Sequence, residues 1–310
     1  MKVIFMGTPD FSVGTLHALV EAGHEVVLAV TQPDKPKGRG KAMQAPPVKE
    51  AALAHHIPVY QPKRIREPQC VEYLKTIPAD VIVVVAFGQI LPKEILEMTR
   101  YGCINVHASL LPTYRGAAPI QWAVIDGEKE TGVTTMQMDE GLDTGDMMMR
   151  TVVPLAEDET GGSLFDRLSE EGAKLLIRTL EAVEKGTVVY EKQDSSASTY
   201  AKMIRKDLGR IDWTMEAEAI ERLVRGLNPW PSAYTKLNGK TLKIWKAEVL
   251  PGEEGSPGMV TAVTRDAILV GTGKGLLAMK EIQLEGKKRM STEAFLRGFE
   301  VQPGFLLGEA

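Results

Sequence analysis

One short run, residues 80–86, constrains the fold of this chain more than any other feature. Every position inside it is valine or isoleucine, so the run has the β-branched composition of a strand and is apolar on both faces. A strand of this kind must be covered on both sides, which is typical of the centre of a parallel α/β sheet. The fold therefore has to supply helices for two faces of a sheet.

The rest of the first half alternates strand and helix patterns. Apolar runs occur at 2–6 and 25–31, helical spacing at 11–22 and 48–56, and extended chain returns at 57–60. Strands that alternate with helices indicate βαβ units, and the sites of such sheets lie beyond the carboxyl ends of the strands. The sequence predicts an α/β fold with a doubly wound, mostly parallel, Rossmann-like sheet.

A different pattern follows the helical stretch 163–185. Residues 193–199 are polar and serine-rich, a helix is predicted at 215–226, and Asn238-Gly239 separates two alternating runs, which is a strong hairpin signal. Further alternating runs continue to residue 284, so we expect a small, OB-like antiparallel β-barrel. The predicted domains are a catalytic domain at 1–190, a linker at 191–207 and the barrel at 208–310.

Composition narrows the class of protein. A chain of 310 residues is long enough for two domains, and two cysteines exclude a disulfide framework and fit a reducing cytosol. No apolar stretch is long enough to cross a membrane, so we expect a cytoplasmic protein without membrane contact. The net charge of −4 argues against indiscriminate nucleic-acid binding, although the part from Asp207 onward is neutral, with 14 basic and 14 acidic residues.

Asn105 and His107 form the first candidate site. They are two positions apart in a predicted strand, so their side chains share a face, and together they can polarise one carbonyl group. No cysteine or carboxylate lies at ligand spacing, so no metal is expected. A purely structural hydrogen-bonding pair is the alternative. The small-residue loop that begins at Arg115 favours the catalytic interpretation, because loops after strand ends bind substrates in α/β enzymes.

The second candidate is the acidic, glycine-punctuated loop 138–146. It lacks the alternating oxygen ligands of a calcium-binding loop, and a solvated turn is the alternative. We interpret Asp143 as a carboxylate beside His107 that determines which imidazole nitrogen carries the proton.

Basic residues supply the third candidate. The loop 32–47 is longer than most loops in compact domains, and a basic residue recurs at every second position: Lys35, Lys37, Arg39 and Lys41. An exposed flexible loop and a phosphate-contacting arm are both open interpretations. In the predicted barrel a positive surface could be formed by Lys243, Lys246 and Lys287, or these could be scattered solvated lysines.

Taken together, these motifs resemble the methionyl-tRNA formyltransferase family. The resemblance covers the whole chain and is carried by the segments 7–11, 86–92, 105–112 with Asp143, and 228–231. It implies a catalytic set of Asn105, His107 and Asp143, and an RNA-contacting insertion around Arg39. It also implies a folate site lined by Ser109, Leu110, Leu111, Pro112, Phe87, Gln89 and Ile90.

The resemblance implies transfer of a formyl group from 10-formyltetrahydrofolate to the amine of methionyl initiator tRNA, without a metal. We expect a monomer. Two alternatives stay open: a formyltransferase that acts on an amino-sugar nucleotide, and a non-catalytic tRNA-binding protein.

Overall fold

A computed structural model describes residues 1–37, 42–252 and 255–308. The chain divides into two compact units. The first comprises Met1–Gly116, Glu130–Pro154 and Phe165–Ala201, and the second comprises Ala117–Lys129, Leu155–Leu164 and Lys202–Ala310. The units therefore interleave along the chain, because the second includes two stretches that lie within the predicted segment 1–190.

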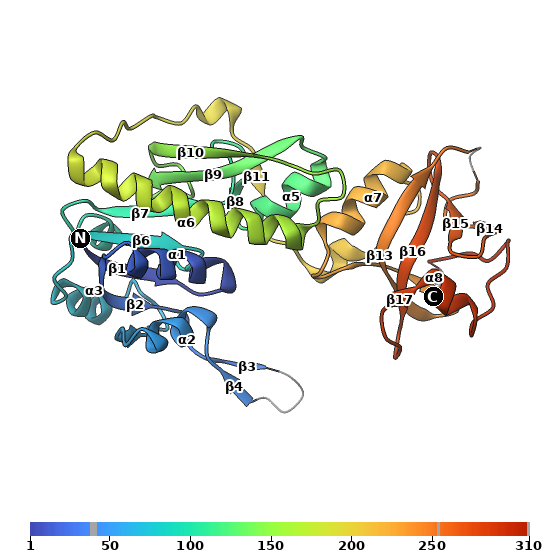
Figure 1. Cartoon of the computed structure of the whole chain (residues 1–310), viewed down its shortest axis with the longest axis horizontal. Helices are drawn as coiled ribbons and strands as arrows, with labels where there is room; N and C mark the ends of the chain where they lie inside the picture. The colour runs from blue at the N-terminus through green and yellow to red at the C-terminus, as the bar shows by residue number, and fades with distance from the viewer. Residues whose placement is uncertain (38–41, 253–254, 309–310) are drawn as a thin grey trace. The chain divides into compact units, whose positions relative to one another are not determined.

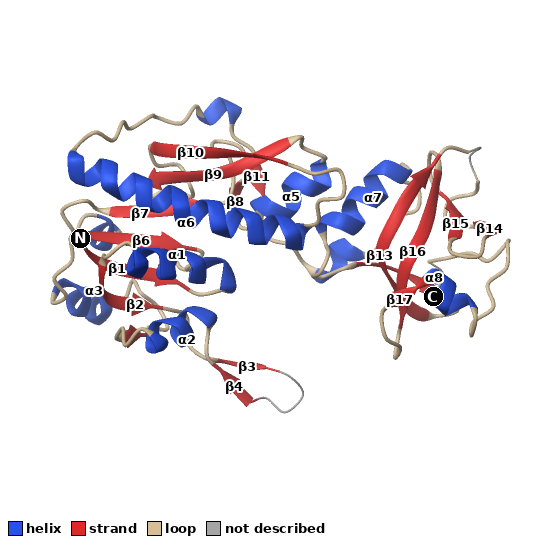
Figure 2. Ribbon diagram, in the orientation of Figure 1, coloured by secondary structure: helices blue, strands red, loops and turns tan. Residues whose placement is uncertain are grey.

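Among the residues described, the first unit is built on a seven-stranded sheet in the order β10-β9-β7-β6-β1-β2-β5 (Figures 1 and 2). Its strands are β1 (Lys2–Gly7), β2 (Glu25–Val30), β5 (Val59–Tyr60), β6 (Val81–Val85), β7 (Cys103–His107), β9 (Glu130–Gln137) and β10 (Met147–Pro154). Neighbours from β5 through β7 pair in parallel, whereas β9 runs antiparallel to β7 and to β10. The predicted mostly parallel sheet is confirmed.

Helices cover both faces of this sheet. Strand β6 is buried at every residue, as predicted. Its Ile82 and Val84 share one core cluster with Leu74 of α3 (Pro68–Lys75) and Ile95 of α4 (Lys93–Leu96). On the other face lie α1 (Asp10–Glu21), which packs against α2 (Pro47–Ala54), and the long α6 (Gly161–Lys185) (Figure 1). Two-sided cover explains why every inner position of this strand is β-branched and apolar.

The long basic loop contains a short hairpin of β3 (Lys35–Lys37) and β4 (Ala42–Gln44). Its base is attached to the sheet by Lys49, whose Nζ lies 2.8 Å from Asp34 Oδ2 and 2.8 Å from Gln61 Oε1. Hydrogen bonds from Lys49 and Gln61 lower the pKa of the Asp34 carboxyl. Arg39 and Lys41 lie outside the described residues.

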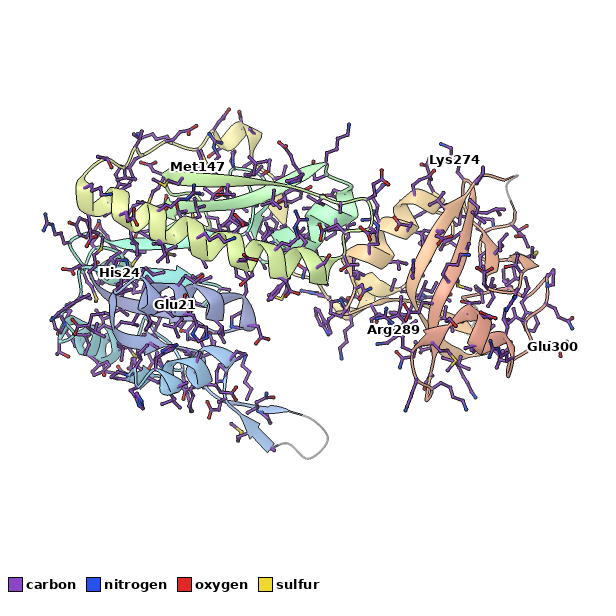
Figure 3. All side chains as sticks on the ribbon, viewed as in Figure 1. Glu21, His24, Met147, Lys274, Arg289 and Glu300 are labelled. Carbon is purple, nitrogen blue, oxygen red and sulfur yellow. The ribbon has the colours of Figure 1, made fainter. Side chains whose placement is uncertain are left out.

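After α6 the chain returns along the sheet. Met147 of β10 (Figure 3) and Glu191 exchange two backbone hydrogen bonds, each 2.8 Å long. A 3₁₀ turn at Ser195–Ala197 follows, and then β11 (Tyr200–Ala201) pairs in parallel with β8 (Arg115–Gly116). The first part of the segment predicted as a linker is therefore bonded to the first unit.

Over its described residues the second unit contains a six-stranded antiparallel sheet in the order β12-β13-β16-β15-β14, with β17 paired to β16. The strands are β12 (Ala233–Leu237), β13 (Lys240–Leu250), β14 (Val260–Val263), β15 (Ile268–Gly271), β16 (Leu276–Leu284) and β17 (Met290–Ser291). Asn238 and Gly239 join β12 to β13 with φ of 49° and 72°, the left-handed backbone that an Asn-Gly hairpin requires. The predicted hairpin and antiparallel architecture are confirmed.

The helices of the second unit are α5 (Pro119–Asp126), a 3₁₀ turn at Lys206–Gly209, α7 (Ala217–Gly226) and α8 (Thr292–Leu296). Ile220 and Val224 of α7 enter the core formed by the sheet, and Arg222 Nε donates to the Ile125 carbonyl of α5 at 3.1 Å. These contacts explain why α5 groups with the second unit. In the described part of the chain, no helix is both long enough and apolar enough to cross a membrane.

Candidate active site

Asn105 and His107 lie in the second half of β7, at the carboxyl edge of the first sheet. Both residues are nearly buried, with exposures of 8% and 6%, and alternation along the strand places them on one face. Cys103 has the same parity but lies at the start of the strand, where burial raises its pKa to about 12. A thiol with this pKa is not a nucleophile at neutral pH, so Asn105 and His107 remain the candidates on this strand.

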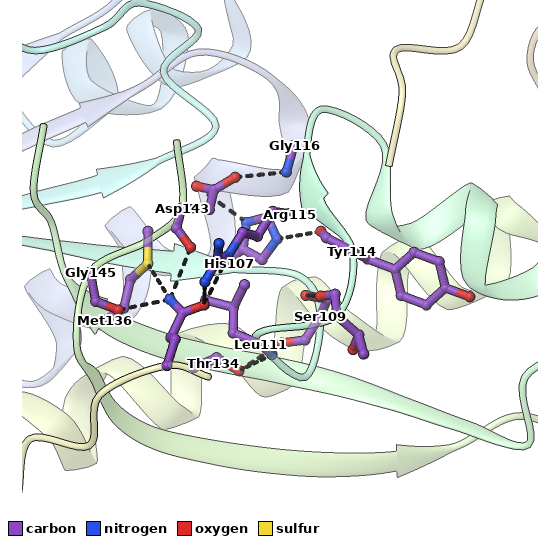
Figure 4. A network of polar contacts seen from close by, with 12 residues as sticks. His107, Ser109, Leu111, Tyr114, Arg115, Gly116, Thr134, Met136, Asp143 and Gly145 are labelled. Atoms are coloured by element: carbon purple, nitrogen blue, oxygen red, sulfur yellow. Dashed lines mark hydrogen bonds and ion pairs between the residues drawn. The ribbon is translucent and has the colours of Figure 1, made fainter. Parts of the chain in front are cut away.

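The His107 ring is oriented by a backbone carbonyl. Its Nε2 lies 2.9 Å from the Tyr114 oxygen, and a carbonyl only accepts hydrogen bonds, so this nitrogen carries a proton. Its Nδ1 faces Asp143 Oδ1 at 3.8 Å, which is ion-pair range but too long for a hydrogen bond (Figure 4). The tautomer, expected to be set by Asp143, is therefore set by Tyr114 in this structure.

Asp143 is held toward the imidazole by the Gly116 N–H and by the tight turn of its own loop. Its Oδ2 accepts a hydrogen bond from the Gly116 N–H at 2.8 Å, and its backbone has a left-handed φ of 54°. A Cβ on Gly145 would lie 1.7 Å from the Gln137 carbonyl oxygen, so this tight loop requires glycine there. The same loop also contains Asp139, whose carboxylate stabilises the turn. It accepts hydrogen bonds from the Gly141 N–H and the Thr144 hydroxyl.

The Asn105 amide is available to a bound molecule. No side chain or backbone group among the described residues hydrogen-bonds to it. Because this amide can donate two hydrogen bonds, it can bind an oxygen atom next to the imidazole.

The turn after β7 contains four of the residues predicted to line a folate site. Its geometry is fixed internally, since Ser109 Oγ donates to the Thr113 carbonyl at 2.6 Å and Thr134 Oγ1 donates to the Ser109 carbonyl at 2.7 Å. Leu111 packs with Met136 in a small buried cluster. Leu110 is half-buried, and the Leu111–Pro112 peptide is cis.

The other predicted folate residues follow β6, the strand next to β7. Phe87 is buried and its carbonyl accepts from Thr8 Oγ1 at 3.1 Å, whereas Ile90 is 77% exposed. Gln89 uses its amide within the protein, accepting from Ile65 N–H at 2.7 Å and donating to the Pro62 carbonyl at 3.2 Å. The segments 87–90 and 109–112 thus follow adjacent strands at the same edge of the sheet.

Gln193 and Arg115 also contact the site, although neither was predicted to belong to it. The Gln193 amide lies between the Arg115 guanidinium and the Asp143 loop, 2.8 Å from Arg115 Nη2 and 2.9 Å from the Asp143 carbonyl. Arg115 carried a sequence signal, because it opens the loop after a strand end. Gln193 carried none, since its neighbours are polar and serine-rich like those of a linker.

The predicted RNA-contacting residues occupy both units. Lys35 and Lys37 lie on β3 of the first unit, while Lys243, Lys246 and Lys287 belong to the second unit, on β13 and after β16. Lys246 and Lys287 are exposed and Lys243 is half-buried.

Comparisons with known proteins identify the family. The model of the formyl transferase family matches residues 1–180, and that of the formyl transferase C-terminal domain matches 203–300. The chain is 64% identical to methionyl-tRNA formyltransferase of Agathobacter rectalis over 98% of both chains. It is 58% identical to that of Lachnospira eligens over the full length of both.

A solved structure agrees on the fold. The N-formyltransferase from Helicobacter canadensis superposes with a TM-score of 0.65 at 18% identity, covering 94% of this chain and 100% of that one. The fold, the buried imidazole–carboxylate pair and the full-length matches agree, and the chain belongs to the methionyl-tRNA formyltransferase family.

Proposed function

We propose that this chain transfers the formyl group of 10-formyltetrahydrofolate to the α-amino group of methionine on initiator tRNA. The observation that carries the proposal is the 64% identity to the Agathobacter rectalis enzyme over 98% of both chains. The carboxyl edge of the first sheet offers the chemistry that this reaction needs.

The catalytic set in this proposal is Asn105, His107 and Asp143. The free amine of the aminoacyl group attacks the formyl carbon, and the carbonyl oxygen becomes an oxyanion in the tetrahedral intermediate. The Asn105 amide donates to that oxygen, as does His107 Nδ1 when it is protonated. Donors aimed at developing charge in a water-poor site are the strongest kind of transition-state stabilisation.

Proton movement falls to the His107–Asp143 pair. The attacking amine must lose a proton, and N10 of the folate must gain one as its bond to the formyl carbon breaks. Asp143 Oδ1 lies 3.8 Å from His107 Nδ1. Asp143 can accept the amine proton directly or through water.

The folate is proposed to bind along segments 87–90 and 109–112. The exposed Ile90 and the half-buried Leu110 offer apolar contact for a flat ring. Ile90 follows β6, and Leu110 follows the neighbouring β7, which carries Asn105 and His107. The Gln89 amide bonds to the backbone at Pro62 and Ile65, and the Ser109 hydroxyl bonds within its own turn, so their contribution is to shape the wall of the folate site.

Transfer RNA is proposed to bind through two basic regions, one in each unit. The first is the β3–β4 hairpin with Lys35, Lys37, Arg39 and Lys41, whose base is fixed by the contact of Lys49 with Asp34. The second surrounds Trp245 on β13.

We call the second region the Trp245 face: Lys243, Trp245, Lys246, Lys287 and Arg289. A register irregularity between Ile244 and Ala247 leaves Lys246 exposed and Trp245 half-buried, while Ile244 and Ala247 stay buried. The Arg289 guanidinium lies 4.6 Å from the centre of the indole ring and Lys243 Nζ lies 5.6 Å from it. An aromatic ring flanked by cations is the combination that binds nucleic-acid backbones and exposed bases.

A cytoplasmic location and a monomeric state complete the proposal. Both cysteines are buried free thiols, which fits a reducing compartment. Analytical ultracentrifugation at micromolar concentration checks the oligomeric state, and a dimer would contradict the proposal.

The decisive experiment measures formylation of four acceptors by the purified chain with 10-formyltetrahydrofolate. These are methionyl initiator tRNA, methionyl elongator tRNA, uncharged initiator tRNA and an amino-sugar nucleotide. Formylation of the first, with little or none of the others, is expected. Modification of the sugar nucleotide instead, or binding of tRNA without formylation, would overturn the assignment.

A further inference from the structure

Before the chain enters the last part of the second unit, it passes along the carboxyl edge of the first sheet, beside the loops that contact His107. We call residues 193–201 the strap. Its last two residues pair with Arg115 and Gly116, and the Arg115 N–H donates to the Thr199 carbonyl at 2.9 Å. A Cβ on Gly116 would lie 2.6 Å from the Tyr200 ring, so the strap contacts the loop beside His107 with no room for a side chain between them.

Gln193, the first residue of the strap, binds the loop that carries Asp143. Its Nε2 donates to the Asp143 carbonyl at 2.9 Å and to the Gly145 carbonyl at 2.7 Å. Its Oε1 accepts from Arg115 at 3.0 Å and 2.8 Å. A guanidinium can only donate and a carbonyl can only accept, so the orientation of this amide is fixed by its partners.

Thr199, near the other end of the strap, binds the second group that touches His107. Its Oγ1 accepts from the Tyr114 N–H at 2.8 Å, and the carbonyl of the same Tyr114 accepts from His107 Nε2 at 2.9 Å. The strap therefore fixes the backbone on both sides of the imidazole: Tyr114 next to Nε2 and Asp143 next to Nδ1.

We propose that Gln193 and Thr199 are positioning residues that set the orientation of His107 and its distance from Asp143. Neither residue contacts the reacting atoms in this account, and the inference rests on the proposed formyl transfer. Because a shift of about 1 Å in a catalytic group can cost about a hundredfold in rate, loosening the strap should lower kcat more than it raises KM.

The first experiment compares Gln193→Glu with Gln69→Glu. A carboxylate at 193 can still accept from Arg115 but cannot donate to the carbonyls of Asp143 and Gly145. Gln69 is exposed on α3, so the same change there is a matched control. We expect Gln193→Glu to lower kcat about ten- to a hundredfold, with KM for folate within about twofold of the original chain. The control should retain both values.

The second experiment compares Thr199→Val with Thr199→Ser. Valine has nearly the shape of threonine but removes the acceptor for Tyr114, whereas serine keeps it. We expect valine to lower kcat and shift the pH dependence of kcat, and serine to restore both toward the original values. This pair decides the question if Gln193→Glu does not fold.

A third measurement does not depend on turnover. Nitrogen-15 NMR of the histidine rings, with the His107 signals assigned from a His107→Gln variant, reports the tautomer and the titration of His107. The original chain should show the Nε2–H form at high pH, and Thr199→Val should alter that pattern while Thr199→Ser should not.

Unchanged kcat, pH dependence and His107 signals in both Gln193→Glu and Thr199→Val, with loss of thermal stability alone, would overturn the inference and make the strap merely structural. Failure of the original chain to formylate methionyl initiator tRNA would refute the proposed function instead, and the NMR comparison would still report on the strap.

Discussion

The carboxyl edge of the first sheet, with His107 and Asp143, and the Trp245 face differ in how far their charged side chains are exposed to solvent. At the edge, the side chains of His107 and Asp143 are 7% and 14% exposed, and each accepts or donates a hydrogen bond to backbone. On the Trp245 face, Arg289 is 43% exposed and forms a bidentate pair with Glu281, and Lys246 and Lys287 are in solvent.

This difference explains what each region can contribute. Buried polar groups act with full strength on a bound molecule, but only in one fixed geometry. Exposed charges are screened by salt and attract a polyanion with little dependence on exact position. We therefore expect single changes at the edge to alter turnover and single changes on the Trp245 face to alter RNA affinity.

The largest expected effect tests the edge. Replacing His107 with asparagine removes a donor to the oxyanion and should lower kcat by about a hundred- to a thousandfold in the formylation assay. The matched control is His56→Asn, because His56 is exposed and its φ of 57° suits asparagine. Normal turnover of His107→Asn at saturating substrates would contradict the expectation that changes at the carboxyl edge alter turnover.

A smaller effect is expected from the basic insertion. Changing Arg39 to alanine removes a charged donor, and a charge-assisted hydrogen bond worth about 1.5 kcal/mol corresponds to about a tenfold loss. KM for methionyl-tRNA should rise by that factor while folate affinity stays constant, as measured by steady-state kinetics and a folate-binding titration. An equal loss of folate affinity would show that the basic loop affects the folate site at the carboxyl edge of the first sheet.

The Trp245 face should respond more weakly still. Arg289→Ala should raise KM for tRNA a few-fold and reduce the slope of its logarithm against the logarithm of salt by about one. Arg265→Ala is the matched control, because Arg265 is 87% exposed on another part of the same unit. A fall in kcat with unchanged KM would contradict the assignment of this face to RNA.

The last prediction concerns the buried thiol at the start of β7, away from the carboxyl edge. Burial raises the pKa of Cys103 from 9.0 to about 12, so the unfolded chain releases this proton before the folded chain does. The thiol therefore contributes no pH dependence below about pH 9, and stability falls as pH rises from 9 toward 12. Between pH 8 and pH 10 the original chain should lose about 1 kcal/mol relative to Cys103→Ala in chemical unfolding. Equal losses in the two chains would show that solvent reaches the thiol.

Most of the fold could be predicted because its signals are local. The run at 80–86 became β6, the helical spacing at 163–185 became α6, and Asn238-Gly239 became the hairpin between β12 and β13. The basic loop 32–47 gave no strand pattern, and its β3–β4 hairpin pairs only three residues on each side.

The catalytic site was predictable only in part, since some of its contacts are distant in sequence. Asn105 and His107 share a strand and were predicted together. Gln193 meets partners that lie 50 and 78 positions away, and nothing in a polar, serine-rich segment indicates such contacts. The orienting carbonyl of Tyr114 is a backbone group, which no side-chain pattern reveals. The roles of the site residues stay predictions.

The strap also bears on how this protein is made. Synthesis releases the chain from its N-terminus, and domains generally fold in that order. Every strand of the seven-stranded sheet has been made by residue 154, and α6 is complete at residue 185. The backbone groups on either side of His107 are nevertheless not both fixed until Gln193 and Thr199 have emerged. A nascent chain can thus hold a complete sheet and all three proposed catalytic side chains and still lack an ordered site, so we expect activity only after residues 193–199 have been made.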